Sequence, residues 1–263
     1  MKISAVIIAF NEEDKIADAV KSVGWADEII VVDSESTDRT RTIAETFGAV
    51  VFQKNWEGFS KQKQFAVECA ANDWIFSLDA DERVSDELKQ EILNLKNNPK
   101  NISADGYKIP RLSFYMNRPI RHGGWYPDWQ LRFFNRRKGK WRNVLIHESV
   151  QMSENSIVKK LRGDILHFSV EDVSHHHQMI GTRYAPLAAR QMFERGKRAS
   201  ALKIHTVGMT TFLQDYFIKG GFLDGLAGYT IARFAAHHAF LKYSLLREMQ
   251  QTNQTPVNKS PKS

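Results

Sequence analysis

Two acidic residues, Asp79 and Asp81, stand two positions apart directly after the apolar run 74–78. Side chains two residues apart in an extended segment point to the same side, so we expect both carboxylates to face one site. Carboxylate oxygens in this arrangement suit Mg²⁺ or Mn²⁺, which can also accept diphosphate oxygens from a nucleotide. The alternative is a solvated acidic turn before a helix. The position at the end of a buried strand favours the metal site.

A third acid, Asp33, follows another apolar run at 28–32. Its carboxylate could accept hydrogen bonds from a base or a ribose, or it could only cap the next turn. The chain contains neither G-x-G-x-x-G nor G-x-x-x-x-G-K-[ST], the glycine-rich patterns that cradle phosphates. A bound diphosphate would therefore need a metal to neutralise it, which weakens the case for a dehydrogenase or an NTPase.

The elements that must position these acids belong to the first 105 residues, where short apolar runs alternate with helical segments. Continuous apolar strands joined by helices predict a parallel sheet with helices on both faces, so the fold class is α/β. The carboxyl ends of such strands share one edge, which brings their polar residues into one cleft. Ser36, Ser60 and Ser85 are the expected helix N-caps. The strands are expected at 3–10, 28–32, 49–52 and 74–78, and the helices at 12–23, 37–47, 61–71 and 86–96.

The remainder of the chain changes pattern twice. Residues 106–172 contain strand-like segments at 106–114 and 130–134 around an aromatic loop, and we assign them to the second half of the same domain. Residues 173–249 have helical character, and the polar residues 250–263 are expected to form a disordered tail.

Charge divides the chain in a similar way. Residues 1–105 hold 12 Lys and Arg against 20 Asp and Glu, whereas residues 106–263 hold 25 against 10. A basic half can attract nucleic acid, an anionic membrane or a phosphorylated substrate. The single cysteine, Cys69, and the absence of a visible signal peptide are typical of a reducing compartment, so we expect a cytoplasmic protein.

Six segments resemble family-2 glycosyltransferases with the GT-A fold. The general family signature is seen in 7–13 (IIAFNEE), 31–38 (VVDSESTD) and 78–81 (LDAD). The lipopolysaccharide-core glucosyltransferase subgroup is resembled by 122–128 (HGGWYPD), 130–134 (QLRFF) and His147-Glu148. The resemblance implies inverting transfer of a hexose, expected to be glucose from UDP-glucose, onto a lipid-linked anionic saccharide such as the lipopolysaccharide inner core.

The resemblance also implies donor-binding residues. Phe10, Glu12 and Asp33 would hold the nucleoside, while Asp79 and Asp81 would hold the diphosphate and the metal, Mg²⁺ or Mn²⁺. Two further residues have open alternatives. Lys63 either contacts the donor or lies on a solvated helix face, and His167 either approaches the metal and diphosphate or is a buried structural histidine.

Inverting displacement needs a general base that takes the proton of the acceptor hydroxyl. Glu148 and Asp128 are the candidates. Relatives outside the subgroup commonly carry an acidic pair where this chain has His147-Glu148. We favour Glu148 and keep Asp128 as the alternative.

Acceptor binding is expected around the Gly123-Gly124 turn. Trp125, Tyr126 and Trp129 could stack on sugar rings, or they could pack as a small satellite core. Arg132 would suit a phosphate or carboxylate on the acceptor. The run 175–177 of three histidines is not expected to bind metal, because neighbours on a helix point about 100° apart.

Two other functions compete with sugar transfer. A nucleotidyltransferase acting on sugar phosphates would also use paired acids and a metal, but its usual glycine-rich phosphate loop is absent after the first strand. A nucleic-acid-binding module would explain the basic half, but no zinc-finger spacing or aromatic-basic RNA signature supports it. We therefore expect no nucleic-acid partner.

Residues 207–247 contain many large apolar side chains together with Lys219, Arg233, Lys242 and Arg247. No run of 18 apolar residues occurs there, so we expect an amphipathic helix pair that turns near Gly220-Gly221 and lies at a membrane interface. The alternative is that these helices pack on the α/β core. The first reading predicts a peripheral protein on the cytoplasmic face of the bacterial inner membrane, bound to its anionic surface.

Overall fold

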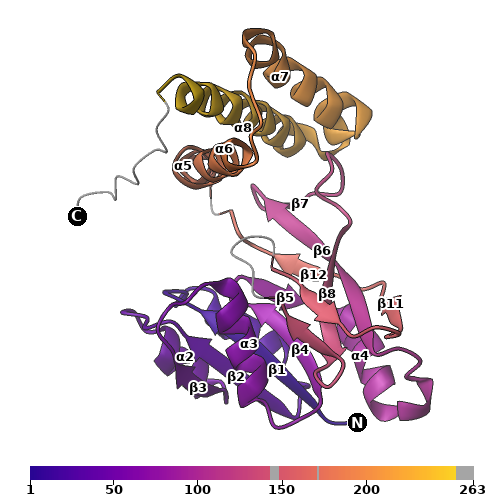
Figure 1. Cartoon of the computed structure of the whole chain (residues 1–263). Coiled ribbons are helices and arrows are strands. Elements are labelled where there is room, and N and C mark those ends of the chain that lie inside the picture. Colours follow the sequence, from indigo (N-terminus) through magenta and orange to yellow (C-terminus); the bar gives the residue numbers. More distant parts are fainter. Residues whose placement is uncertain (143–147, 171, 253–263) are drawn as a thin grey trace. The chain divides into compact units, whose positions relative to one another are not determined.

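The computed structural model describes residues 1–142, 148–170 and 172–252. The chain forms two compact units (Figure 1). The first unit consists of Met1–Ser113 and Pro127–Ser169, and the second consists of Phe114–Tyr126 and Val170–Ser263. The functional segments 1–105, 106–172 and 173–249 that the sequence suggests stay a prediction.

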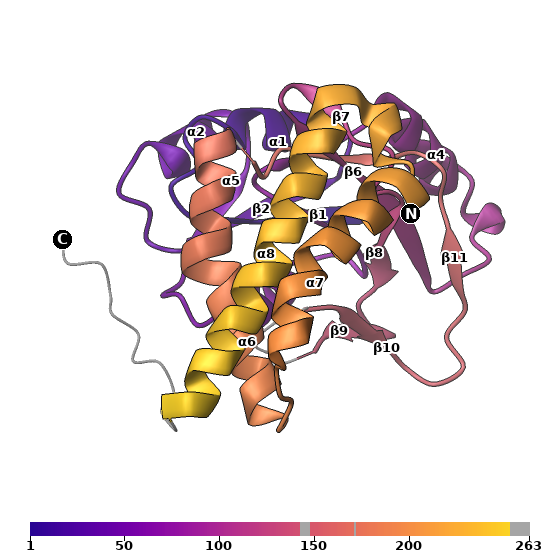
Figure 2. The same cartoon turned by 90° about the horizontal axis from the view of Figure 1, so that it is seen from above.

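The first unit is an α/β structure built on one large mixed sheet (Figure 2). The strand order is β3-β2-β1-β4-β8-β6-β12-β5. The strands β1 to β4 are parallel where they pair, and β8 lies antiparallel between β4 and β6. In chain order the elements are β1 (Ile3–Ala9), α1 (Ile16–Ser22), β2 (Glu28–Asp33), α2 (Thr40–Thr46), β3 (Val50–Gln53), α3 (Phe59–Cys69), β4 (Trp74–Asp79), β5 (Glu82–Val84), α4 (Asp86–Asn97), the 3-10 helix η1 (Pro99–Asn101), β6 (Gly106–Tyr115), β8 (Asp128–Asn135), β9 (Gly139–Trp141), β10 (Val150–Met152), β11 (Val158–Lys160) and β12 (Ile165–His167).

Both faces of this sheet are buried, which explains why its strands are continuously apolar. On one face Ile7 of β1 packs in a core that also contains residues of α1, α2 and α4. On the other face Ile8 packs in a second core with Ala66 and Val67 of α3. Successive side chains of a strand alternate between faces, so a strand covered on both sides needs apolar residues at every position. The predicted α/β class, with helices on both faces, is confirmed.

The helix starts are only partly as predicted. Ser85 caps α4, because its hydroxyl accepts a hydrogen bond from the backbone N–H of Leu88 at 3.2 Å. The other two N-cap predictions are wrong. The hydroxyl of Ser36 instead accepts from the N–H of Asn11, and α2 starts later, at Thr40. Ser60 lies inside α3, which follows Gly58 with its φ of 101°.

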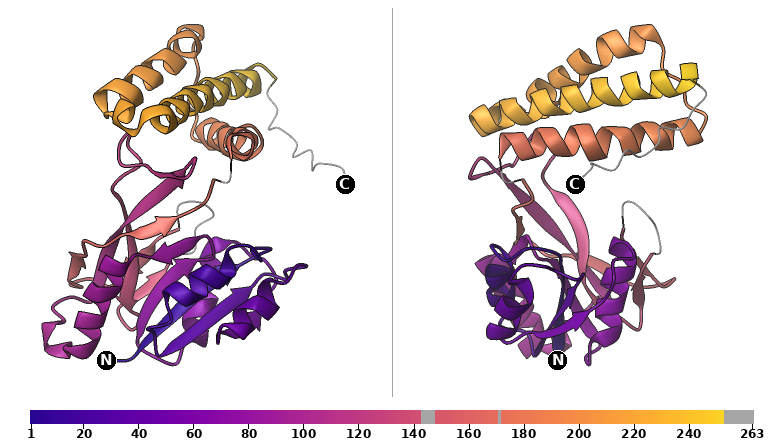
Figure 3. Two further views of the ribbon diagram at one scale, coloured as in Figure 1. Left: turned by 180° about the vertical axis from the view of Figure 1, so that it is seen from behind. Right: turned by 90° about the vertical axis from the view of Figure 1, so that its left-hand side faces the viewer.

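The second unit is helical. Its elements are β7 (Arg118–Pro119), which pairs with the end of β6, and then α5 (Val173–Met179), the π-helix η2 (Ile180–Tyr184), α6 (Ala185–Glu194), α7 (Ala201–Leu213), the π-helix η3 (Gln214–Ile218), the 3-10 helix η4 (Gly221–Asp224) and α8 (Gly225–Thr252). The long helix α8 lies between α6 and α7 (Figure 3). This confirms the predicted helical extension from about residue 173.

The predicted turn near Gly220-Gly221 is present between η3 and η4. Gly220 has a φ of 70°, and a Cβ on Gly221 would lie 2.8 Å from the carbonyl oxygen of Asp215. A side chain at either position would strain the turn. Residues 250–252 of the predicted tail continue α8, and residues 253–263 lie outside the described residues. Among the helices that the structure describes, none combines the length and apolar character needed to cross a membrane.

Candidate active site

The polar ends of three strands meet at one edge of the sheet, as the α/β pattern predicts. In the parallel register Ala9 of β1 lies beside Asp33 of β2, and Ile8 lies beside Asp79 of β4. The two acids that end β2 and β4 therefore stand on either side of the end of β1. Because β1 is the strand between them, Phe10 and the residues after it lie at the same edge.

Asp33 is fully buried, and one of its two carboxylate oxygens accepts a hydrogen bond. Its Oδ2 atom accepts a hydrogen bond from the backbone N–H of Ser36 at 3.0 Å. Its Oδ1 atom is buried and has no hydrogen-bond donor within the described part of the chain. An unsatisfied buried carboxylate oxygen costs free energy unless a ligand supplies a donor. Beside it, Phe10 is 55% exposed, so its ring is accessible to a planar ligand. This pair has the chemistry to hold a nucleobase.

The loop after β1 is held by the loop after β2. Asn11 adopts a φ of 51°, and its side-chain oxygen accepts from the N–H of Thr37 at 2.9 Å. The N–H of Glu12 donates to the hydroxyl of Thr40 at 2.8 Å, and the Glu12 carboxylate pairs with Lys15 at 3.3 Å. The backbone of Glu12 therefore helps to hold these two loops together, and its carboxylate already pairs with Lys15.

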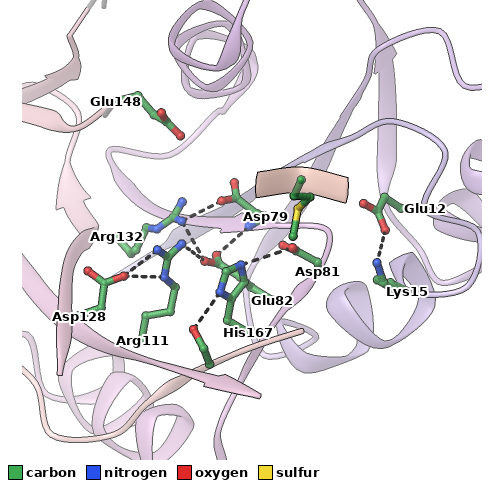
Figure 4. Close-up of polar contacts among 12 residues, drawn as sticks. Glu12, Lys15, Asp79, Asp81, Glu82, Arg111, Asp128, Arg132, Glu148 and His167 are labelled. Carbon is green, nitrogen blue, oxygen red and sulfur yellow. Dashed lines mark hydrogen bonds and ion pairs between the residues drawn. The ribbon is translucent and has the colours of Figure 1, made fainter. Parts of the chain in front are cut away.

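Asp81 faces His167, which reaches it from β12 (Figure 4). The His167 Nε2 atom lies 3.4 Å from Oδ2 of Asp81, and the opposite ring nitrogen, Nδ1, lies 3.2 Å from the Ser113 hydroxyl. Burial would raise the pKa of the Asp81 carboxyl, but hydrogen bonding to His167 and its charge hold that pKa below the ordinary value. An ionised carboxylate and an imidazole fixed through its far nitrogen are the usual parts of a metal site.

The sequence predicts that Asp79 and Asp81 face one site, but in the structure the two carboxylates have different partners. The Asp79 carboxylate accepts from Arg132 at 2.8 Å and pairs with Lys63 at 2.9 Å. Burial would raise the pKa of Asp79, but the charges of Arg132 and Lys63 hold it well below its ordinary value. Within the described residues no three His, Cys, Asp or Glu side chains are grouped closely enough to hold a metal ion. The pair Asp81 and His167 is thus the candidate metal site, and Asp79 belongs to an ion network.

That network joins both candidate general bases in one chain of alternating charges. From one end to the other it runs through Glu148, Lys63, Asp79, Arg132, Glu82, Arg111 and Asp128. At one end, Glu148 has a 3.2 Å contact with Lys63. At the other end, Arg111 donates to Asp128 through Nε and a terminal nitrogen, at 2.9 and 2.6 Å. Gln130 also donates to Asp128, at 2.7 Å.

Burial decides between the two alternatives for Lys63 and describes the surroundings of Arg132. Lys63 is only 2% exposed, so the solvated helix face is wrong. It also lies 5.0 Å from the ring centre of Trp141. Arg132 is 3% exposed, and its guanidinium pairs with Asp79 and Glu82. One terminal nitrogen of Arg132 thus serves the network, while its Nε atom and the other terminal nitrogen are buried without an acceptor among the described residues, so the binding of an anionic acceptor group by Arg132 stays a prediction.

The three aromatic residues of the predicted acceptor loop are not placed in one unit. Trp125, in the second unit, packs edge-on against Tyr115 and belongs to a small apolar cluster, as the satellite-core alternative predicts. Tyr126, in the same unit, lies under the guanidinium of Arg121. Trp129 is the second residue of β8 in the first unit, with the Lys160 ammonium 4.1 Å from its ring centre. His147 lies outside the described residues.

The sequence reasoning missed Glu82, Arg111 and Ser113. Glu82 is fully buried and accepts from both arginines of the network. Ser113 fixes the ring of His167. A signal was available for Arg111, since a charged residue inside an otherwise apolar strand needs a buried partner. Ser113, two positions later, lies on the same face of β6.

Known proteins with sequences similar to this chain are described as glycosyltransferases. The model of glycosyl transferase family 2 matches residues 4–160. A Rickettsia typhi protein described as an uncharacterized glycosyltransferase is 32% identical over 258 residues, which are 94% of this chain and 87% of that protein. The lipopolysaccharide core biosynthesis glycosyltransferase LpsC of Rhizobium meliloti is 31% identical over 257 residues, 92% of this chain and 90% of LpsC. The crystal structure of S. aureus TarS 1–349 covers 97% of this chain and 92% of its own length, with a TM-score of 0.49 and 16% identity.

A sheet of the GT-A type with acids at its carboxyl edge, matched by a family model over most of its length, defines a glycosyltransferase. The chain belongs to glycosyl transferase family 2. Membership decides against the nucleotidyltransferase alternative, because the family model extends across the acids on which that alternative was based.

Proposed function

We propose that this protein is an inverting, metal-dependent hexosyltransferase that uses UDP-glucose as donor and a lipid-linked anionic saccharide, such as the lipopolysaccharide inner core, as acceptor. The observation that carries the proposal is the pair of Asp81 and His167 at the edge of the sheet where Asp33 and Phe10 also lie. The similarity to LpsC over nearly the whole chain supports the acceptor class.

The donor end of the site suits a uracil base. Asp33 offers a buried carboxylate oxygen without a donor, and uracil carries an N–H that can supply one. Cytosine lacks a proton at the corresponding ring nitrogen, so only its amino group could supply the donor. The exposed ring of Phe10 can stack on the base.

Asp81 and His167 would hold Mg²⁺ or Mn²⁺, with diphosphate oxygens and water as the remaining ligands. When bound, the ion neutralises the charge that develops on the leaving diphosphate. The donor set fits the ion, because the carboxylate is ionised and Ser113 holds the imidazole in place. Lys63 and Arg132 keep Asp79 ionised close to this position and hold its carboxylate in one orientation.

Glu148 is the proposed general base. It takes the proton from the acceptor hydroxyl while that oxygen attacks the anomeric carbon and the bond to the diphosphate breaks on the opposite side. Glu148 is 24% exposed and pairs with Lys63 through one carboxylate oxygen, so the other side of its carboxylate can reach a substrate. Asp128 is less suited, because two nitrogens of Arg111 and one of Gln130 already occupy its oxygens.

Trp129 and Lys160 are the residues of the first unit with the chemistry to contact the acceptor. An aromatic ring beside an ammonium group can bind a sugar that carries an anionic substituent. Tyr126 is half-buried and stays a proposed contact of the acceptor, whereas Trp125 packs in the core of the second unit.

Thermal unfolding with a panel of nucleotide sugars tests the proposal. UDP-glucose with Mn²⁺ at about 100 times its Kd should add about 2.7 kcal/mol of stability, because the ligand binds only the folded chain. UDP-glucose in excess EDTA should add much less. Asp81→Asn should remove the Mn²⁺-dependent part, while Glu154→Gln, a change at an exposed acid of the same unit, should not. Equal stabilisation of wild type and Asp81→Asn would contradict the metal site, and a preference for CDP- or ADP-sugars would contradict the donor.

A further inference from the structure

One face of α7 in the second unit carries large apolar side chains that are exposed. Leu202 is 74% exposed and Met209 is 64% exposed, and Leu213 and Phe217 continue the same line. These residues are spaced by seven, four and four positions, which places them on one side of a helix. Val207 is buried and lies on the side of α7 that packs toward the other helices. The helix is therefore apolar on both sides, although only one side packs on the protein.

The apolar line ends at the turn between η3 and η4. Ile218 is 81% exposed, and Leu223 and Leu226 are each at least 60% exposed. The rings of Phe212, Tyr216 and Tyr229 pack on one another with centres 5.3 to 5.8 Å apart. The exposed Phe217 packs edge-on against the first two of these rings. The exposed residues thus stand on a packed support. Contiguous exposed apolar surface of this kind marks an interaction site.

Positive charge accompanies this surface. The second unit holds 14 Lys and Arg against 6 Asp and Glu, whereas the first unit holds 23 against 24. Near the start of α7, Lys203 and Lys242 both lie 5.4 Å from the ring centre of Tyr243. Burial, together with the charges of Lys203 and Lys197, lowers the pKa of Lys242. In the described part of the chain none of these three lysines forms an ion pair, so an anion brought to them would relieve their mutual repulsion.

We propose that this face, formed by Leu202, Met209, Leu213, Phe217, Ile218 and Leu223, docks on an anionic lipid bilayer, with α7 lying in the interface and the lysines at its start on the headgroups. A helix with exposed apolar residues along one side and lysines beside it has the composition of an interfacial helix. A second copy of this chain is a poorer occupant, because it would bring another unit of balance +8 against this one. This face shares no residue with the proposed sugar-transfer site.

Vesicle sedimentation with the full chain tests whether the exposed apolar residues contribute to membrane binding. The probe is a vesicle of 30% phosphatidylglycerol in phosphatidylcholine, without donor or saccharide, so failure here leaves the transfer proposal standing. Leu202→Glu with Ile218→Glu should weaken binding at least tenfold, and Met209→Glu with Leu223→Glu should do the same. The matched control, Val50→Glu with Ile157→Glu, removes two exposed apolar residues of the first unit and should bind as wild type.

A second set of experiments tests whether the lysines contribute to membrane binding. Lys197→Gln with Lys203→Gln should weaken binding several-fold, whereas Lys100→Gln with Lys138→Gln should not. Pure phosphatidylcholine vesicles should bind wild type at least tenfold more weakly, and high salt should release it. Wild type that fails to sediment with anionic vesicles would overturn the proposal. So would a protein that is dimeric in solution, becomes monomeric in the Leu202→Glu and Ile218→Glu variant, and binds vesicles equally well in both forms.

Discussion

Glu148 and Asp128 are the two candidates for the general base, and their surroundings differ. Glu148 pairs with Lys63, whereas Asp128 is held by Arg111 and Gln130. We expect Glu148→Gln to lower kcat by roughly 10² to 10⁴ fold with little change in donor affinity, because the amide keeps the shape but cannot take a proton. Steady-state kinetics and donor titration measure the two effects separately.

Asp128→Asn is the companion variant. We expect it to lower the thermal stability, because Arg111 loses a charged partner, and to lower kcat less than Glu148→Gln does. The opposite order of kcat values would transfer the role of base to Asp128.

His176 should make the stability of the protein depend on pH. It is buried in the second unit, with its Nδ1 atom 3.1 Å from the Tyr115 hydroxyl. Burial, with the nearby charges of His175 and His238, lowers its pKa to about 4. The unfolded chain takes up a proton on this residue near pH 6.5, so the free energy of unfolding falls as the pH drops from about 6.5 to about 4, by up to about 3 kcal/mol.

Thermal unfolding between pH 7 and pH 4 measures this contribution. His176→Asn keeps a hydrogen-bonding group but does not titrate, so its stability should decline less over that window than that of wild type. His205→Asn changes an exposed histidine of α7 and should follow the wild-type curve. Parallel curves for wild type and His176→Asn would refute the account.

At the scale of elements, the placement of β12 depends on a close approach to α4. A Cβ on Gly163, just before β12, would lie 2.2 Å from the backbone nitrogen of Leu88 in α4. Gly163→Ala should therefore force β12 away and destabilise the protein by about 1 to 3 kcal/mol, the range for overpacking. Because β12 carries His167, the affinity for Mn²⁺ with UDP should fall as well.

Gly181→Ala is the matched control in η2. A Cβ there would meet no atom within 4 Å and Ala favours a helix over Gly, so this change should leave the protein at least as stable as wild type and its metal binding unchanged. Differential scanning calorimetry and Mn²⁺ titration with UDP present provide the two readings. A stable Gly163→Ala variant with unchanged Mn²⁺ affinity would mean that β12 tolerates the displacement.

At the scale of the whole molecule, the two units should respond to different ligands. The residues with donor chemistry lie in the first unit, and the exposed apolar face lies in the second. Hydrogen exchange with UDP-glucose and Mn²⁺ should therefore slow exchange at the ends of β1, β2 and β4 and leave α7 unchanged. Anionic vesicles should slow exchange in α7 and leave the strand ends unchanged. Protection of α7 by the donor alone would show that the two functions are not separate.

The sequence by itself determined the sheet and its edge. Continuous apolar runs with helices between them predicted parallel strands buried on both faces, so the acids at 33 and 79 were expected at the same edge of the sheet as the end of β1. The structure added that β1 lies between the other two strands. The turn at Gly220-Gly221 was predictable for a similar local reason, since glycine is the residue that accepts such backbone angles.

Only the tertiary structure decided which side chains meet. Asp79 and Asp81 are neighbours in sequence, yet one pairs with residues of α3 and β8 and the other with a residue of β12. Those partners lie 16 to 86 positions away along the chain, and spacing within a motif carries no information about them. The burial and the ion pairs of Lys63 and Arg132 could not be predicted for the same reason. Each looked accessible as a single residue, but a buried charge must find an opposite charge, and the packing of distant elements determines which one it finds.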